Sequence, residues 1–97
     1  MLVLVSYDVS TADKRGAARL RQVAKACTDY GQRVQKSVFE CDLDPAQWTN
    51  MRDRLVTLIE PEQDSLRFYF LGKKGRQRVE HVGANPSPDL KHDALVV

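Results

Sequence analysis

The residue best placed for chemistry in this sequence is Asp8, which ends an apolar run at residues 2–8. The run is apolar on both alternating faces, a pattern typical of a central strand that is covered on both sides. Mg²⁺ is commonly held by one or two carboxylates together with water and phosphate oxygens of the substrate. Asp8 is therefore a candidate ligand for Mg²⁺, or for another divalent cation such as Mn²⁺, that activates water to hydrolyse a phosphodiester. The pattern leaves open the alternative that Asp8 simply ends a strand.

Basic residues follow Asp8 closely and are of the kind that binds phosphate. The amide groups of the first turn of an expected helix, together with Lys14 and Arg15, suit an anion. Residues 72–75 lack the P-loop pattern, so the lysines there are expected to contact a phosphate backbone without reading sequence. The residues that we expect to contact nucleic acid are Lys14, Arg15, Arg19, Arg33, Lys36, Ser37, Lys73, Lys74 and Arg76. The alternative for each basic run is a solvated face.

The other reactive residue types indicate no further site. Cys27 and Cys41 form no Cys-x-x-Cys pair, and we expect them to be buried, reduced thiols. His81 and His92 lack zinc-ligand spacing and are expected at the surface or at a sheet edge. Tyr7 is expected to be a core or rim aromatic rather than a catalytic acid. Reduced thiols, and an N-terminal run too short for a signal peptide or a membrane span, favour a cytoplasmic protein without a membrane partner.

Two helices are expected, and each begins with a capping pattern. Ser10 and Asp13 fit a capping box in which Ser10 is the N-cap, and Gly31 is expected just past the end of this first helix. Asp44 caps a second helix that has Pro45 at its first position and ends before residue 61.

Strands are expected around these helices, at residues 2–8, 32–36, 37–43, 65–71 and 76–82. A break in the alternation near Lys36 indicates a tight hairpin or a β-bulge. The order βαββαβ predicts an α+β, ferredoxin-like domain, with an antiparallel sheet and both helices on one face. The length of 97 residues suits one domain, with a core at about residues 1–71 and an extension at about 72–97 that adds a C-terminal strand.

This fold leaves one face of the sheet uncovered, although the first strand is apolar on both faces. A homodimer that packs sheet against sheet would cover that face, and a domain this small gains stability from association. The net charge of +2 is too small to indicate a partner.

The expected topology isolates Asp8 from the other acidic residues. The first and third strands are antiparallel neighbours, which places Asp8 beside Ser37, whereas Asp42 and Asp44 fall at the opposite edge. Ser37 has no histidine nearby, so it is expected to donate a hydrogen bond to phosphate rather than act as a nucleophile. Each chain offers one carboxylate, and a two-fold axis near Asp8 would supply a second one from the partner.

Three segments resemble the small CRISPR-associated Cas-two proteins. They are the strand at residues 3–10 followed by Asp13-Lys14-Arg15, the run at 30–41 (YGQRVQKSVFEC) and the run at 64–69 (DSLRFY). The resemblance covers about residues 1–71 in register. Gly16 stands where many members of that family carry another basic residue, which implies one weaker phosphate contact.

The resemblance implies a ferredoxin-like homodimer in which the last strand often crosses onto the partner's sheet. It implies that Asp8 of both chains faces the dimer interface and holds a divalent metal. It also implies metal-dependent nuclease activity on RNA or double-stranded DNA, and a role as the bridge of the Cas-one–Cas-two integrase in spacer acquisition, with spacer DNA across its basic surface.

Several functions therefore stay open at the level of sequence. The first is a metal-dependent endonuclease, and the second is a non-catalytic DNA-binding scaffold of the integrase complex, in which nuclease activity is dispensable. A toxin-like endoribonuclease family that shares the fold is the nearest enzymatic competitor. A regulatory module that binds a small metabolite is disfavoured by the basic first helix and by the resemblance.

Overall fold

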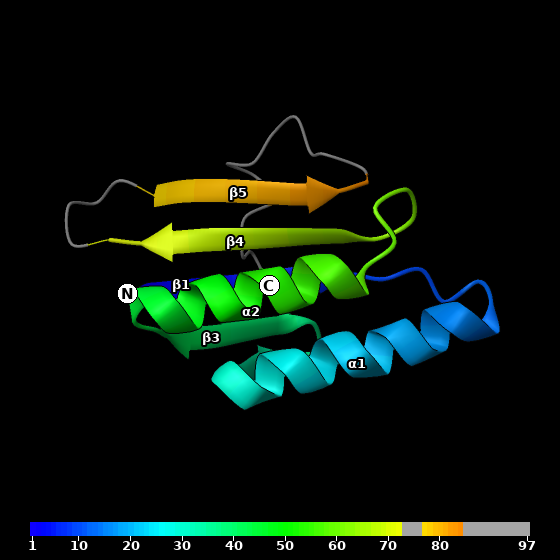
Figure 1. Cartoon of the computed structure of the whole chain (residues 1–97), viewed down its shortest axis with the longest axis horizontal. Helices are drawn as coiled ribbons and strands as arrows, with labels where there is room; N and C mark the ends of the chain where they lie inside the picture. Colours follow the sequence, from blue (N-terminus) through cyan, green and yellow to red (C-terminus); the bar gives the residue numbers. More distant parts are fainter. Residues whose placement is uncertain (73–76, 85–97) are drawn as a thin grey trace.

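The described part of the chain forms a layer of strands and a layer of helices. The computed structural model describes residues 1–72 and 77–84. In chain order the elements are β1 (Leu2–Asp8), α1 (Lys14–Tyr30), β2 (Gln32–Gln35), β3 (Val38–Asp42), α2 (Pro45–Leu58), β4 (Ser65–Leu71) and β5 (Gln77–Gly83). The sheet order is β2-β3-β1-β4-β5, with each pair antiparallel, and Figure 1 shows both helices on the same face. The predicted α+β, ferredoxin-like fold is confirmed.

The core lies between the sheet and the helices because alternate residues of the central strands point toward the helices. Val3 and Val5 of β1 and Phe68 of β4 have no exposed area on this face. From the helical layer, Met51 of α2 is fully buried, and the indole of Trp48 meets the Phe68 ring edge-on with centroids 4.9 Å apart. This packing fixes α2 against the sheet.

The two cysteines belong to this core, as predicted. Cys27 and Cys41 are buried free thiols. Burial raises the pKa of Cys27 to about 12 and that of Cys41 to about 11. Because the thiolate is the reactive form, neither residue is a nucleophile at neutral pH.

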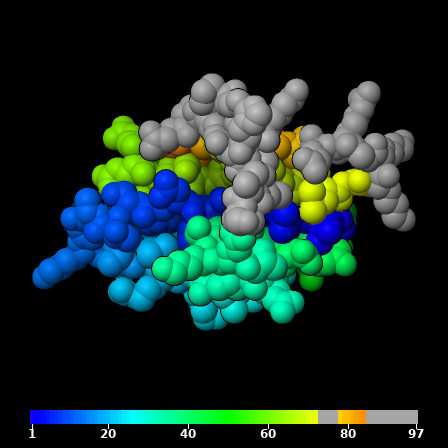
Figure 2. Space-filling view, turned by 180° about the vertical axis from the view of Figure 1, so that it is seen from behind, coloured from blue at the N-terminus to red at the C-terminus, as the bar shows by residue number. Residues whose placement is uncertain are grey.

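The opposite face of β1 carries Leu2, Leu4, Ser6 and Asp8. In the described part of the chain no helix covers this face (Figure 1). Figure 2 looks onto this side, where the blue N-terminal segment lies between the cyan-green β2–β3 hairpin and the yellow β4. The homodimer that would cover this face stays a prediction.

The start of α1 differs from the prediction. The helix begins at Lys14, and Asp13 is its N-cap, with a carboxylate that accepts a hydrogen bond from the Gly16 amide at 2.8 Å. Ser10 is therefore not the N-cap, because its amide is bound elsewhere, by the Asp64 carboxylate at 2.9 Å. The chain at Ser10 also passes so close to α1 that a Cβ on Gly16 would lie 1.9 Å from the Ser10 carbonyl oxygen.

Other local predictions are confirmed or refined. The Asp44 capping box and the Pro45 position in α2 are as expected, and a β-bulge lies between Arg33 and Gln35 in the β2–β3 hairpin. Gly31 ends α1 as its C-cap in an extended conformation, with φ of −158°. The predicted strand at 76–82 is β5, one residue later, whereas residues 73–76 and the predicted C-terminal strand lie outside the described residues. None of the described helices has the length and apolar character needed to span a membrane.

Candidate active site

The exposed carboxylate of Asp8 lies at the edge of the sheet where β1 ends. On one side it pairs with Ser65 of β4. On the other side β1 meets the β2–β3 turn, where the Tyr7 amide donates to the Ser37 carbonyl at 3.1 Å. Asp42 pairs with Leu2 at the far end of the same strand. The structure thus places Asp8 beside Ser37 and away from Asp42, as the topology predicted.

An open groove of about 410 Å³ lies beside Asp8. The residues that line it are Tyr7, Asp8, Val9, Leu20, Arg21, Ala24, Arg33, Lys36 and Ser37. Four predicted site residues come together here: Asp8, Arg33, Lys36 and Ser37. Arg21 was not predicted and adds a third cation. A groove lined by one carboxylate and three cationic side chains is suited to an anion that also contacts a metal ion.

Tyr7 forms the wall of this groove and is a core residue, as expected. Its ring stacks on Phe39 with centroids 6.2 Å apart, and the Arg33 guanidinium lies 5.0 Å from the centre of the Phe39 ring. Burial raises the pKa of Tyr7, the nearby Cys27 raises it further, and Arg33 opposes both. The phenol is therefore neutral at physiological pH, and it donates to the Lys36 carbonyl at 3.2 Å. This bond ties the β2–β3 turn to the end of β1.

Asp64 anchors the loop that follows Asp8, a role that the sequence analysis did not predict. Its side chain has no exposed area and accepts hydrogen bonds from the Ser10 amide at 2.9 Å, the Glu60 amide at 2.9 Å and Arg19 Nε at 2.8 Å. Burial alone would raise the pKa of Asp64, but the bonds from Arg19 and the two amides outweigh it and lower the pKa. The sequence feature that could have indicated this role is a carboxylate directly before an apolar strand.

The other residues predicted to contact nucleic acid either do not line this groove or lie outside the described residues. The Arg19 side chain is largely buried against Asp64, so in this structure it helps to hold the β1–α1 loop in place. Lys14 and Arg15 are exposed in the first turn of α1 and do not line the groove. The structure does not describe Lys73, Lys74 and Arg76.

The donor set around Asp8 suits a cation that keeps much of its own shell. Within residues 1–72 and 77–84 no group of three His, Cys, Asp or Glu residues could hold a metal ion. Asp8 is the only acidic residue that lines the groove in this part of the chain. One carboxylate fits Mg²⁺ bound mostly by water and phosphate oxygens, and it does not fit a cage made by one chain.

Comparisons with known proteins identify the family of this chain. The family model described as CRISPR associated protein Cas2 matches residues 1–79, which include Asp8 and the whole groove. The chain belongs to the Cas2 family. Relatives in this family include the CRISPR-associated endoribonuclease Cas2 of Nitratidesulfovibrio vulgaris, 61% identical over 92% of this chain and 87% of the relative. The CRISPR-associated endonuclease Cas2 of Halalkalibacterium halodurans is 56% identical over 99% of both chains.

Solved structures share the fold. Streptococcus pyogenes Cas2 at pH 6.5 superposes with a TM-score of 0.69 and 56% identity, over 75% of this chain and 88% of that one. A hypothetical protein from Thermus thermophilus gives a TM-score of 0.64 at 37% identity, over 89% and 96%. The family named by the sequence resemblance is therefore confirmed.

Proposed function

We propose that this member of the Cas2 family is a metal-dependent endonuclease that hydrolyses phosphodiester bonds of RNA or DNA. The observation that carries the proposal is the groove that an exposed Asp8 lines together with Arg21, Arg33 and Lys36. The names of the relatives, endoribonuclease and endonuclease, support the same reaction class.

Each residue of the groove has a role that follows from its chemistry. Asp8 would hold Mg²⁺ or Mn²⁺ through its carboxylate. The bound ion supplies an activated water and charge stabilisation at the phosphate. Arg33 and Lys36 bind and orient the scissile phosphate, because cationic donors position a phosphate backbone without reading its sequence. Ser37 donates a hydrogen bond to a phosphate oxygen.

A homodimer would complete the site. The uncovered sheet face carries Leu2 and Leu4 on the same side of β1 as Asp8. Packing this face against a second copy buries the apolar residues and brings the two Asp8 carboxylates toward one another. A second carboxylate would give Mg²⁺ the two acidic ligands that it commonly takes.

One observation favours a second candidate function, a DNA-binding scaffold that bridges the Cas-one integrase in spacer acquisition. Among the described residues a single carboxylate serves the groove, whereas several cations surround it. Such a surface binds nucleic acid whether or not it cleaves.

Cleavage by an Asp8→Ala variant separates the two functions. We expect wild-type protein to cleave RNA or DNA only with a divalent metal, and Asp8→Ala to bind the same substrates without cleaving them. Asp42→Ala is the matched control, because Asp42 is an exposed carboxylate at the other end of the same strand pair. Cleavage by Asp8→Ala at the wild-type rate would refute the endonuclease proposal. Binding without cleavage in the wild type would leave the scaffold role.

A further inference from the structure

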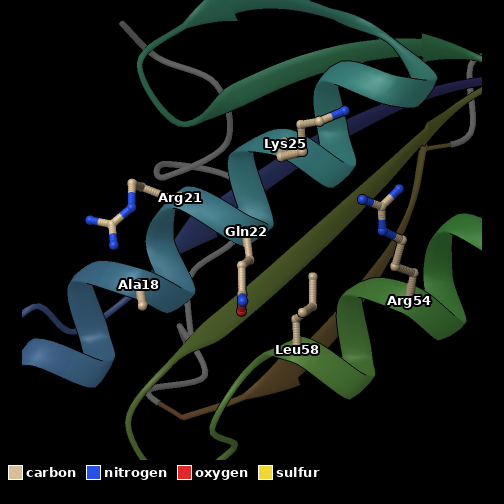
Figure 3. Close-up of a pocket in the computed structure, with 6 residues that line it drawn as sticks. All are labelled: Ala18, Arg21, Gln22, Lys25, Arg54 and Leu58. Atoms are coloured by element: carbon tan, nitrogen blue, oxygen red, sulfur yellow. The ribbon is translucent and has the colours of Figure 1, made fainter.

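A second groove lies between the two helices, on the outer side of the molecule. It measures about 410 Å³ and is lined by Ala18, Arg21, Gln22, Lys25, Arg54 and Leu58. Figure 3 shows Gln22 extending from α1 toward α2, while Leu58 and Arg54 extend from α2 toward α1. Within the described residues no acidic side chain lines this groove.

Arg21 belongs to both grooves. It lines the Asp8 groove together with Arg33 and Lys36, and it lines the interhelical groove together with Lys25 and Arg54. In Figure 3 the Arg21 side chain points away from α2, so the guanidinium stands on the flank of α1 between the two depressions. Lys25 follows one helical turn later, about 6 Å along the axis. The cations therefore form one path across α1.

A single carboxylate holds the two cations at the far end of this path. Asp29 accepts from Lys25 Nζ at 2.6 Å and from Arg54 Nη1 at 2.8 Å. The Lys25 bond, and then the Arg54 bond, lower the pKa of Asp29, so it stays ionised at neutral pH. Lys25 and Arg54 remain partly exposed, at 68% and 40% of their side-chain area. One negative charge thus orients two accessible positive charges and leaves an excess of positive charge.

We propose that the interhelical groove is a second binding site for the phosphodiester backbone of the same nucleic acid strand. A strand with one phosphate at Asp8 passes over Arg21 and continues along Lys25 and Arg54. The inference rests on the proposed function, because it extends the strand that enters the Asp8 groove. Lysine and arginine contacts to phosphate add affinity that is independent of sequence and falls with salt.

The test compares oligonucleotides that fill one groove or both, measured without divalent metal so that nothing is cleaved. Single-stranded RNA and DNA of about four and about 16 nucleotides span the usual range of a single-strand site. We expect Lys25→Gln/Arg54→Gln to weaken binding of the long strand and leave the short one unchanged. The slope of log affinity against log salt should fall by about 1.4, which corresponds to two lost phosphate contacts.

Arg52→Gln is the matched control. Arg52 lies on the same helix as Arg54, but its guanidinium is bound by Glu80 at 2.6 Å. We expect this variant to bind both lengths as the wild type does. Because the double variant removes two charges and Arg52→Gln removes one, a loss for the long strand in Arg52→Gln of half that in the double variant, or more, would indicate a general charge effect and overturn the second site.

Asp29→Asn provides a test in the opposite direction. It keeps the shape of the side chain and releases two cations, so we expect tighter binding of the long strand and a steeper salt slope. Unchanged or weaker binding would contradict the proposal, provided that thermal unfolding shows an intact fold. Failure of Asp8-dependent cleavage would count against the proposed function alone, because these binding measurements use no metal and no cleavage.

Discussion

Two aspartates on either side of the β1–α1 loop have opposite environments. Asp8 is exposed at a strand end, and the other charged residues that line its groove in the described part of the chain are cations. Asp64 has no exposed area and receives hydrogen bonds from Arg19 and from the amides of Ser10 and Glu60. An exposed carboxylate is available to a metal ion, whereas a buried and fully bonded one is structural. Asp64 therefore stabilises the loop, whereas Asp8 is accessible for the proposed metal binding.

Replacing Asp64 tests this division. We expect Asp64→Asn to lower the free energy of unfolding by about 3 kcal/mol at pH 7, because it leaves the largely buried Arg19 side chain and two amide donors without an ionised partner. Urea unfolding followed by circular dichroism measures the loss. The matched variant is Glu80→Gln, which breaks a half-exposed pair with Arg52 and should cost less than about 1 kcal/mol.

The pH dependence of stability provides a second test of the role of Asp64. The pKa of Asp64 is lower in the folded protein than in the unfolded chain, so its contribution is complete above the unfolded value of about 3.9. That contribution is lost as pH falls through the lowered folded pKa. Wild-type protein should thus lose stability in this acid range more steeply than Asp64→Asn. Parallel curves for the two proteins would contradict the role assigned to Asp64.

Among the elements, the crossing of the β1–α1 loop over α1 explains the glycine at position 16. The Gly16 amide is bound by Asp13, and the Ser10 backbone lies against its Cα. A side chain here would collide with backbone, which cannot move aside as a flexible side-chain end can. The structure therefore gives Gly16 a packing role in addition to the weaker phosphate contact that the resemblance implies.

Gly16→Ala discriminates packing from helix propensity. Propensity alone predicts that alanine stabilises the helix by about 1 kcal/mol. We expect the opposite sign, a loss of about 1–3 kcal/mol, because the new Cβ would lie 1.9 Å from the Ser10 carbonyl oxygen. Thermal unfolding measures the sign directly. A higher melting temperature in the variant would show that the loop has room to move.

Local signals were sufficient to predict some elements and insufficient for others. The α2 start was predictable because Asp44 and Gln47 satisfy each other three residues apart. The α1 start was not, because the Ser10 amide is taken by Asp64, 54 residues away. The residues of the site likewise include some that local patterns predict and some that they do not. Asp8 follows from the strand pattern, whereas the place of Arg21 in the groove depends on how α1 is rotated against the β2–β3 turn.

At the scale of the whole molecule, the interhelical groove and the uncovered sheet face lie on opposite sides of the sheet. The helical layer carries the interhelical groove (Figure 3), and the uncovered face of the sheet carries Leu2 and Leu4 together with Asp8 at the end of β1. A second copy can thus pack on the sheet while nucleic acid occupies the interhelical groove. Dimerisation and strand binding are therefore compatible.

A charge on the uncovered face tests the dimer. Leu4 lies on that face of the central strand β1, and Leu4→Lys would place an ammonium group in the interface of the proposed dimer. We expect the particle mass in analytical ultracentrifugation to fall from that of two chains to that of one. Thr57→Lys adds the same charge to an exposed position on α2 and should leave the dimer intact. A monomeric wild type would contradict the proposed assembly.

The most direct test of the central claim is the cleavage rate as a function of Mg²⁺ concentration for wild-type protein and Asp8→Asn. The variant keeps the size of the side chain and removes its charge, so folding and nucleic acid binding should be preserved. We expect wild-type cleavage to saturate with Mg²⁺ and the variant to lose at least about 100-fold in rate or in metal affinity. The same Mg²⁺ dependence in both proteins would show that Asp8 does not hold the metal.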